Sequence, residues 1–451
     1  MKLSRLTSAA LLIVFITVYA AAELPAAQVL FTPELILSEE YSDNIFLTHE
    51  NEVDDFITSA GVNLRTQIVG RTAGLELNYM PTFNSFADHS DLDYWRHAAR
   101  VSAWNDFSRY TRFEASDDYL ETENPLDETA PVVVGGPVEG PVVDPDFYRR
   151  GRNRYRTNVA QARLIHQFGA NDRVYVGVLH SLLKEIDTTP GVPVDDYTNL
   201  QPLLGLSYWF TQRWGLEMEG YYSDRNYVRT IDGQNNDREE YNGSLRLLHS
   251  LSRTLSAFVE YRHTELHYEE ESGANRDFKI FYPSAGIRYQ FQKTAHILIG
   301  AGYYIQDVED QDRNKGWVAN SEIYKRWAFR SSFIDLIGAS GYEIQDTGTA
   351  DLGLAIYYDA RVVVGHNFTS RLFADAQIRY RYNQYPDEVP EREDHILLAG
   401  AGLRYKVLQW LQFGLTYNYR DFNSDILTDE YTENSVIFSI TMSPAAPYRW
   451  N

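Results

Sequence analysis

The chain has 451 residues, of which 44% are hydrophobic and 14% aromatic, and this content excludes a chain that stays disordered. Its formal net charge of −22 argues against a nucleic-acid partner, which would require a basic surface. The sequence has no cysteine, which excludes disulfides, thiolate metal sites and cysteine nucleophiles.

The N-terminus has the pattern of a secretory signal. Lys2 and Arg5 are followed by the apolar run AALLIVFITVYA and by the small-residue sequence AAAE. The run is shorter than the roughly 18 to 20 apolar residues that a membrane-spanning helix needs. We therefore predict cleavage after Ala22, with residues 1–22 as the signal peptide and residues 23–451 as one exported domain.

The segment 33–58, PELILSEEYSDNIFLTHENEVDDFIT, combines strand-like alternation with many acidic side chains. It predicts an ascending strand that ends near Ile45, the acidic loop THENEVDD and a descending strand that starts at Phe56. Asp43 and Asn44 are expected to brace the turn through hydrogen bonds from side chain to backbone. The first structured element is therefore a β-hairpin with an acidic outer end.

Beyond this hairpin, strand-like alternation continues to the C-terminus, and helical patterning is nearly absent. The stretch LFADAQIRYRY places leucine, alanine, isoleucine and tyrosine on one face and phenylalanine, acidic, amide and arginine side chains on the other. LQFGLTYNYR, LEMEGYY and FYPSAGIRYQF repeat the pattern. The alternation predicts an all-β protein.

The connections between these strands fall into two classes that take turns along the chain. Short ones include FSRY, FTQRW, LSRT and FQKT, and long acidic ones include TIDGQNNDREE, HYEEESGANRD and NQYPDEVPERED. Strands of about ten residues joined in this way are typical of an outer-membrane barrel, with turns in the periplasm and loops outside. Aromatic residues at strand ends, such as Phe107, Phe210 and Trp410, are where an interfacial girdle would lie.

We therefore predict an antiparallel transmembrane β-barrel of about twenty strands, with about eighteen as the alternative. The pairs 151–168 with 173–186, and 315–326 with 329–342, alternate less cleanly than the rest. Twenty strands at about 4.8 Å spacing and about 40° tilt close a cylinder on the order of 40 Å across. Wall side chains cannot fill such a cylinder, so an aqueous lumen is expected unless a loop or partner plugs it.

The longest interruption is residues 121–153, which hold five prolines and four glycines. This composition predicts a loop and not a lost strand. Two interpretations remain open at this stage. Folded inward, the loop is a constriction or lid; left outside, it is a flexible surface loop.

If the leucine and tyrosine faces meet lipid, the opposite face of each strand points into the lumen. The predicted pore lining is Glu217, Glu219, Arg246, Glu260, Arg262, Arg288, Asp375, Gln377, Arg379, Arg381, Arg404 and Arg420. One interpretation is a charged lining that sets selectivity, with arginine favouring anionic solutes. The other is mutual salt bridging that stiffens a wide barrel.

No catalytic, cofactor or metal site is predicted, and the protein is not expected to be an enzyme. No serine, histidine and acid are placed as a catalytic set, and the neighbours His180 and Ser181 point to opposite faces of a strand. Asp310, Asp312 and Asn314 have the spacing of a calcium loop. However, the glycine comes one residue late and the position for the bidentate acid is occupied by serine, so we interpret the run as an acidic external loop.

A short run near the N-terminus carries a family resemblance. It consists of Glu39, Tyr41, Asp43, Asn44, Ile45 and Phe46, followed by DDFIT at 54–58. It resembles the opening of the outer-membrane β-barrel porins of type 2, whose members often accompany exopolysaccharide synthesis and export clusters. The resemblance covers roughly the first 60 residues, implies an outer-membrane barrel and suggests polysaccharide passage. It carries over no functional residues.

These observations together predict a passive conduit in the outer membrane of a Gram-negative bacterium, surrounded by outer-membrane lipid. The expected cargo is an exopolysaccharide handed over by a periplasmic or inner-membrane partner. The alternatives are a general diffusion porin for small solutes and a structural or adhesion barrel closed by the 121–153 loop. The final segment MSPAAPYRWN follows the last strand and is expected in the periplasm. The oligomeric state is not predicted.

Overall fold

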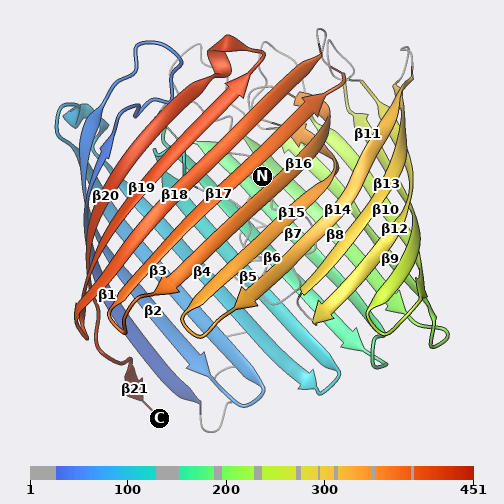
Figure 1. Ribbon diagram of the computed structural model, residues 1–451, viewed down its shortest axis with the longest axis horizontal. Helices are drawn as coiled ribbons and strands as arrows, with labels where there is room; N and C mark the ends of the chain where they lie inside the picture. Colours follow the sequence, from blue (N-terminus) through green and yellow to red (C-terminus); the bar gives the residue numbers. More distant parts are fainter. Residues whose placement is uncertain are drawn as a thin grey trace, which may run out of the picture.

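The computed structural model describes residues 27–127, 152–186, 196–227, 236–270, 276–292, 295–308, 313–346, 351–387 and 391–450. Within these residues a single antiparallel sheet closes on itself as a barrel (Figure 1). The predicted signal peptide, most of the 121–153 loop and the tips of several other loops lie outside the described residues.

Twenty long strands form the wall, and one short strand follows them. The wall strands are β1 (Gln28–Ser42), β2 (Asp55–Val69), β3 (Ala73–Phe86), β4 (Tyr94–Ser108), β5 (Thr111–Thr122), β6 (Tyr155–Gln167), β7 (Arg173–Glu185), β8 (Tyr197–Tyr208), β9 (Trp214–Tyr227), β10 (Arg238–Ser250), β11 (Leu255–Tyr268), β12 (Phe278–Gln292), β13 (Ala295–Val308), β14 (Asn314–Ala328), β15 (Ser332–Asp346), β16 (Asp351–Asn367), β17 (Leu372–Tyr385), β18 (Arg392–Leu408), β19 (Leu411–Ser424) and β20 (Tyr431–Met442). The short strand is β21 (Tyr448–Trp450).

The barrel is closed by the first and last wall strands. β1 pairs with β2 along its whole length and with β20 from Leu35–Met442 to Ser42–Ser435. β21 then pairs with the beginning of β1, at Val29–Phe31. The prediction of an antiparallel barrel of twenty strands is confirmed, including the two strand pairs that alternate less cleanly. β1 ends at Ser42 and not near Ile45, because the residues after it fold back onto the loop and β20.

The connections alternate between the two ends of the barrel as the sequence indicates. Connections from an even to an odd strand are short, as between β4 and β5, whereas those from an odd to an even strand are generally longer (Figure 1). One exception is the connection between β15 and β16, which spans only residues 347–350. Two 3-10 helices, η1 (Ser90–Leu92) and η3 (Leu427–Asp429), lie in long loops. No helix in the part of the chain that the structure describes is long and apolar enough to cross a membrane.

Alternation gives each strand an apolar outer face and a polar inner face. On β17, Ile378 and Tyr380 are exposed and alternate with Arg379 and Arg381, of which Arg381 is fully buried. The same rule applies to β11, where Tyr261 is exposed on the outside. The outer face therefore presents large apolar side chains, as a strand that crosses a lipid bilayer requires.

One hairpin departs from the wall. The pairing between β14 and β15 ends at Ser321–Ser340, although β14 begins at Asn314 and β15 continues to Asp346. β15 nevertheless stays paired with β16 along its full length. The outer half of the β15–β16 hairpin is therefore detached from β14.

The detached half lies on the lumen side of the wall. The Tyr342 hydroxyl lies 3.1 Å from the Thr264 hydroxyl of β11, and the Tyr342 ring meets the Tyr282 ring of β12 edge-on at 5.2 Å. Thr264 and Tyr282 alternate with the exposed Tyr261 and Ile287, so they face the lumen. The hairpin thus forms an inner layer against the wall.

A buried apolar cluster joins the hairpin to the wall. Its members come from β11 to β16 and are Leu266, Tyr268, Phe278, Ile280, Tyr282, Tyr304, Val318, Tyr342, Leu354 and Ile356. The Tyr282 hydroxyl donates to the Val318 carbonyl (3.2 Å), on the stretch of β14 that β15 leaves unpaired. Where the β14–β15 ladder is interrupted, the Tyr282 side chain therefore supplies a hydrogen bond to a backbone carbonyl of β14.

Candidate functional site

Five of the predicted lumen residues form one ion-pair network across β9 to β12. Arg288 makes a bidentate pair with Glu217, with nitrogen–oxygen distances of 2.7 and 2.9 Å. Arg246 bridges Glu217 at 3.1 Å and Glu260 at 2.8 Å. Arg262 lies 3.4 Å from Glu260. The network alternates positive and negative groups around about a fifth of the wall.

A second group of ion pairs lies on β16 to β18. Arg379 donates to both oxygens of Asp359, with the shortest contact at 2.6 Å. Arg404 pairs with Asp375 at 2.7 Å and lies over the Phe373 ring at 4.6 Å. The Arg404 side chain is 52% exposed, so this pair is open to the lumen.

The two remaining predicted arginines, Arg381 and Arg420, pair with carboxylates of other strands. Arg381 is 1% exposed and binds Glu343 of the detached hairpin and Asn383 of its own strand. Arg420 donates to Glu433 of β20 at 2.7 Å. These pairs link the hairpin to β17 and the last two wall strands to each other.

The two other predicted residues make polar contacts with neutral or cationic neighbours. Gln377 accepts a hydrogen bond from Arg361 at 2.6 Å, and Glu219 accepts one from the Tyr175 hydroxyl at 3.1 Å. All seven predicted arginines thus contact a carboxylate of the barrel or of the detached hairpin. This geometry is the mutual pairing that the sequence offered as one interpretation, whereas a role in selectivity stays a prediction.

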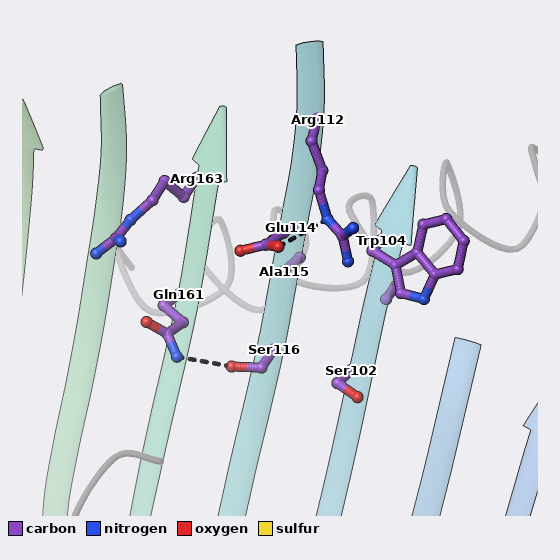
Figure 2. Close-up of a pocket in the computed structure, with 9 residues that line it drawn as sticks. Ser102, Trp104, Arg112, Glu114, Ala115, Ser116, Gln161 and Arg163 are labelled. Atoms are coloured by element: carbon purple, nitrogen blue, oxygen red, sulfur yellow. Dashed lines mark hydrogen bonds and ion pairs between the residues drawn. The ribbon is translucent and has the colours of Figure 1, made fainter. Parts of the chain in front are cut away.

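A shallow depression in the inner wall of β4 to β6 was absent from the predicted lining (Figure 2). It is lined by Ser102, Ala103, Trp104, Arg112, Glu114, Ala115, Ser116, Gln161 and Arg163. Arg112 pairs with Glu114 at 2.8 Å and lies over the Trp104 ring at 4.8 Å. Gln161 donates to Ser116 at 3.0 Å. Strand alternation marks the seven other side chains as inward, whereas Ala103 and Ala115 lie between inward neighbours and belong to the outer face.

Glycines allow two inner aromatic rings to lie flat on the wall. A Cβ at Gly205 would come within 2.3 Å of the Tyr175 ring, and one at Gly74 within 2.6 Å of Trp104. Arg163 in turn lies over Tyr175 at 4.8 Å. The rings and guanidinium groups are stacked along the wall, which keeps their edges and donors directed at the lumen.

The detached hairpin supplies lumen residues that the sequence analysis missed. Glu343 and Gln345 lie on its other face, where Glu343 meets Arg381 and Gln345 accepts a hydrogen bond from Tyr385 at 2.8 Å. The signal was the run LAIYY at 354–358, which is apolar on both strand faces. A wall strand with one face in water would alternate, whereas a strand covered on both faces reads as a continuous apolar run.

The family-like motif of the first hairpin ties the two ends of the barrel together. Asp43 accepts two hydrogen bonds from Asn434 of β20, from the backbone at 2.7 Å and from the side chain at 2.8 Å. The fully buried Asn44 donates to the carbonyls of Thr432 at 2.9 Å and Thr48 at 2.8 Å. The motif therefore extends the contact between β1 and β20 beyond their ladder.

The other motif residues fix the same hairpin. Glu39 and Tyr41 lie on one face of β1, where Glu39 accepts a hydrogen bond from Thr58 at 2.7 Å. Ile45 and Phe46 pack in a small apolar cluster beyond the strand end. The predicted bracing of the turn by Asp43 and Asn44 reaches β20 as well as the loop, a partner that the local sequence does not indicate.

Arg152 connects this hairpin to the chain that enters β6. Its guanidinium donates to the Ile45 carbonyl at 2.8 Å and lies over the Phe86 ring at 4.8 Å. Burial lowers the pKa of Arg152 from its usual value, and the neighbouring Tyr94 and carboxylates such as Glu40 only partly offset this lowering. Residues 128–151 of the 121–153 loop lie outside the described residues, so the interpretation of the loop as a constriction or lid stays a prediction.

The structure offers no built metal site in its described part. Asp310 and Asp312 of the calcium-like run lie outside the described residues, and Asn314 is at the start of β14, where it accepts a hydrogen bond from Tyr304 at 3.2 Å. Within the described ranges there is no group of three or more histidine, aspartate and glutamate side chains able to hold a metal ion.

A family model described as "Putative beta-barrel porin 2" matches residues 210–443, more than half of the chain. The chain belongs to this family. No curated protein matches the sequence. Family membership therefore identifies the protein as a porin barrel. This agrees with the resemblance carried by the first hairpin.

Several solved structures are similar at low identity. Pseudomonas aeruginosa OccK2 (OpdF) in complex with glucuronate is 12% identical, over 92% of this chain and 98% of that one, with a TM-score of 0.37. Acinetobacter baumannii OccAB4 is 13% identical, over 94% and 99%, with a TM-score of 0.39. A BenF-like porin from Pseudomonas fluorescens Pf-5 is 11% identical, over 92% and 99%, with a TM-score of 0.39.

Family membership and the closed barrel together place the protein in the bacterial outer membrane as a porin-type conduit. The wall meets lipid through its apolar outer face, and the charged groups described above lie on its inner face. Among the described residues, those of the ion-pair networks, the β4–β6 depression and the detached hairpin are placed where they can contact a solute.

Proposed function

We propose that the barrel is a passive conduit through which an exopolysaccharide leaves the cell. The observation that carries the proposal is the internal pairing of the charged inner wall, exemplified by Arg288 with Glu217 and Arg379 with Asp359. Paired groups still offer hydrogen bonds, but they leave little unbalanced charge to hold a passing chain. A hydrated polymer can therefore exchange water-mediated contacts along the wall without being trapped.

The resemblance of the first hairpin supports the choice of cargo. Families with this opening often accompany exopolysaccharide synthesis and export clusters, so a periplasmic or inner-membrane partner would deliver the polymer to the barrel. The proposal includes export of the protein itself from the cytoplasm by means of a signal peptide at residues 1–22. It assigns no enzymatic step to the protein.

The first test is single-channel conductance of the purified, refolded protein in planar bilayers. A variant that lacks residues 128–148 serves as its comparison. Steady steps from the intact protein support an open conduit, and steps only from the deletion variant support a conduit closed by that segment. Silence from both proteins contradicts the proposal and favours a structural barrel.

The second test addresses the cargo. A strain that lacks the protein should secrete less polysaccharide and retain polymer in its periplasm, and the intact gene should restore secretion. The matched measurement is uptake of small sugars by the same strains. Unchanged secretion together with reduced sugar uptake would reject polysaccharide export in favour of a general diffusion porin.

A further inference from the structure

The lipid-facing surface of the barrel is apolar at mid-height on nearly every strand. At positions four to seven from the periplasmic end of a wall strand, the outward residue is aliphatic, aromatic, methionine, glycine, proline or serine on eighteen of the twenty described strands. Examples with large exposed side chains are Leu35, Val62, Tyr79, Tyr261, Ile299, Ile378, Tyr417 and Val436. This is the composition expected for the hydrocarbon zone.

Two strands break this rule with ionisable side chains. Asp117 is six positions after Thr111, the first residue of β5, and His180 is seven positions after Arg173, the first residue of β7. The cross-strand partner of both is Ala160 of β6, so the three residues lie in one row.

Neighbouring contacts fix the direction of these side chains. Asp118, the residue after Asp117, pairs with Arg100 on the lumen face, so Asp117 points the other way. His180 stands opposite Leu200 of β8, whose side chain is 42% exposed on the outer face. Both ionisable groups therefore face the lipid.

The surroundings of this pair differ from the rest of the outer surface. Asn158 of β6 donates to the Asp117 carboxylate at 2.5 Å, which extends the polar group along the wall. The outward faces of β4 to β6 beside it carry the small side chains Ala103, Ala115, Ala160 and Ala162. We call this region, together with Asp117, Asn158 and His180, the β4–β7 patch.

We propose that the β4–β7 patch is the surface on which a second copy of this chain packs within the membrane. A carboxylate and an imidazole that face hydrocarbon are costly, and lipid tails offer them no partner. The patch holds a carboxylate acceptor on Asp117 and an imidazole donor on His180, whereas Asn158 already donates to Asp117 and to the Asp118 carbonyl of its own chain. Asp117 of one copy can therefore meet His180 of the other in both directions, as a two-fold interface requires. Its alanines let two walls approach closely enough for these groups to meet.

The proposal is independent of the proposed cargo. The ion-pair networks lie on the opposite face of the wall, so each copy would keep its own lumen. A conduit for small solutes or a closed barrel would present the same outer surface. Failure of the interface would therefore say nothing against polysaccharide passage.

The natural absence of cysteine allows a direct cross-linking test. Ala160→Cys is introduced on β6, with Ala360→Cys as the matched control, because Ala360 is an outward alanine seven positions from the periplasmic end of β16. β16 lies ten strands round the barrel from β6. After oxidation in native membranes, Ala160→Cys should form at least tenfold more covalent dimer than the control. Equal yields, or a covalent adduct with another protein instead of a dimer, would overturn the proposal.

A second comparison tests the polar groups themselves. Asp117→Leu combined with His180→Leu, in the Ala160→Cys background, should reduce the dimer yield at least tenfold. Folding is checked by the shift in gel mobility on heating, which a barrel shows whether or not it dimerises. A folded double variant that cross-links as well as its parent would overturn the role of these two residues as the contact.

Discussion

Asn44 shows how much of the barrel a single side chain can hold. It is fully buried, and its amide contacts the backbone of its own loop and that of Thr432, nearly the whole chain away in sequence. Loss of this amide would remove all three hydrogen bonds at once. Closure of the barrel thus gives a structural reason for the motif that carries the family resemblance.

Asn44→Ala should lower the free energy of unfolding by about 1–3 kcal/mol, because it strands buried donors and acceptors. The measurement is urea unfolding of the refolded protein in lipid vesicles. Glu50→Ala is the control, since Glu50 is exposed in the same loop. Equal stabilities for the two variants would show that the loop does not secure the closure.

Asp375→Ala should shift the pore towards anions. It removes the carboxylate that pairs with Arg404, whose half-exposed guanidinium then adds unbalanced positive charge to the lumen. The reversal potential in a salt gradient measures this shift. The effect should be larger at about 0.1 M salt, where the Debye length is about 10 Å, than at about 1 M, where it is about 3 Å. Glu265→Ala on the outer face is the control, and a shift of equal size there would contradict the lumen assignment.

At the scale of residues, sequence alternation predicts the face of a side chain but not its partners. Arg379 and Arg381 are predicted to face inward because they alternate with the outward residues Ile378 and Tyr380. Their pairing with Asp359 and Glu343 depends on the register of β17 with β16 and on the path of β15, which no local pattern contains.

At the scale of elements, the detached β15–β16 hairpin is the feature that alternation could not predict. Tyr342 and Ile344 alternate with Glu343 and Gln345 in the same way whether the apolar face meets lipid or the inner wall. Both environments are dry, and period two reports only that one face is apolar. The inward path is therefore decided by the apolar surface that β11 to β14 offer.

Tyr342→Ala should loosen this inner layer and raise the single-channel conductance. The side chain loses its contacts with Thr264 and Tyr282, and truncating a large buried aromatic residue costs about 3–5 kcal/mol. Tyr380→Ala, on the outer face of β17, is the control for loss of a tyrosine without a change in the lumen. Unchanged conductance for Tyr342→Ala would mean that the hairpin does not limit the flow of ions.

At the scale of the whole molecule, strand number and topology follow from the sequence because each strand must cross the same apolar layer. That common constraint repeats one pattern twenty times, with turns and loops in fixed alternation. The pairing that closes the barrel cannot be predicted in this way, because it joins β1 and β20, which are not consecutive strands. The predicted periplasmic tail likewise proves to include β21, which pairs with the beginning of β1.

The β1–β20 ladder and the tail that holds β21 should therefore contribute unequally to the folding and stability of the barrel. Truncation after Ser443 removes β21, whose three residues are exposed, but it leaves the pairing of Leu35–Ser42 with β20 intact. We expect a folded barrel with unchanged conductance, less stable by on the order of 1 kcal/mol for each backbone hydrogen bond lost. Val436→Pro, which removes a donor within the β1–β20 ladder, should instead prevent closure. Heat-dependent gel mobility distinguishes the two results, and a truncated chain that fails to fold would show that β21, and not the ladder, completes the barrel.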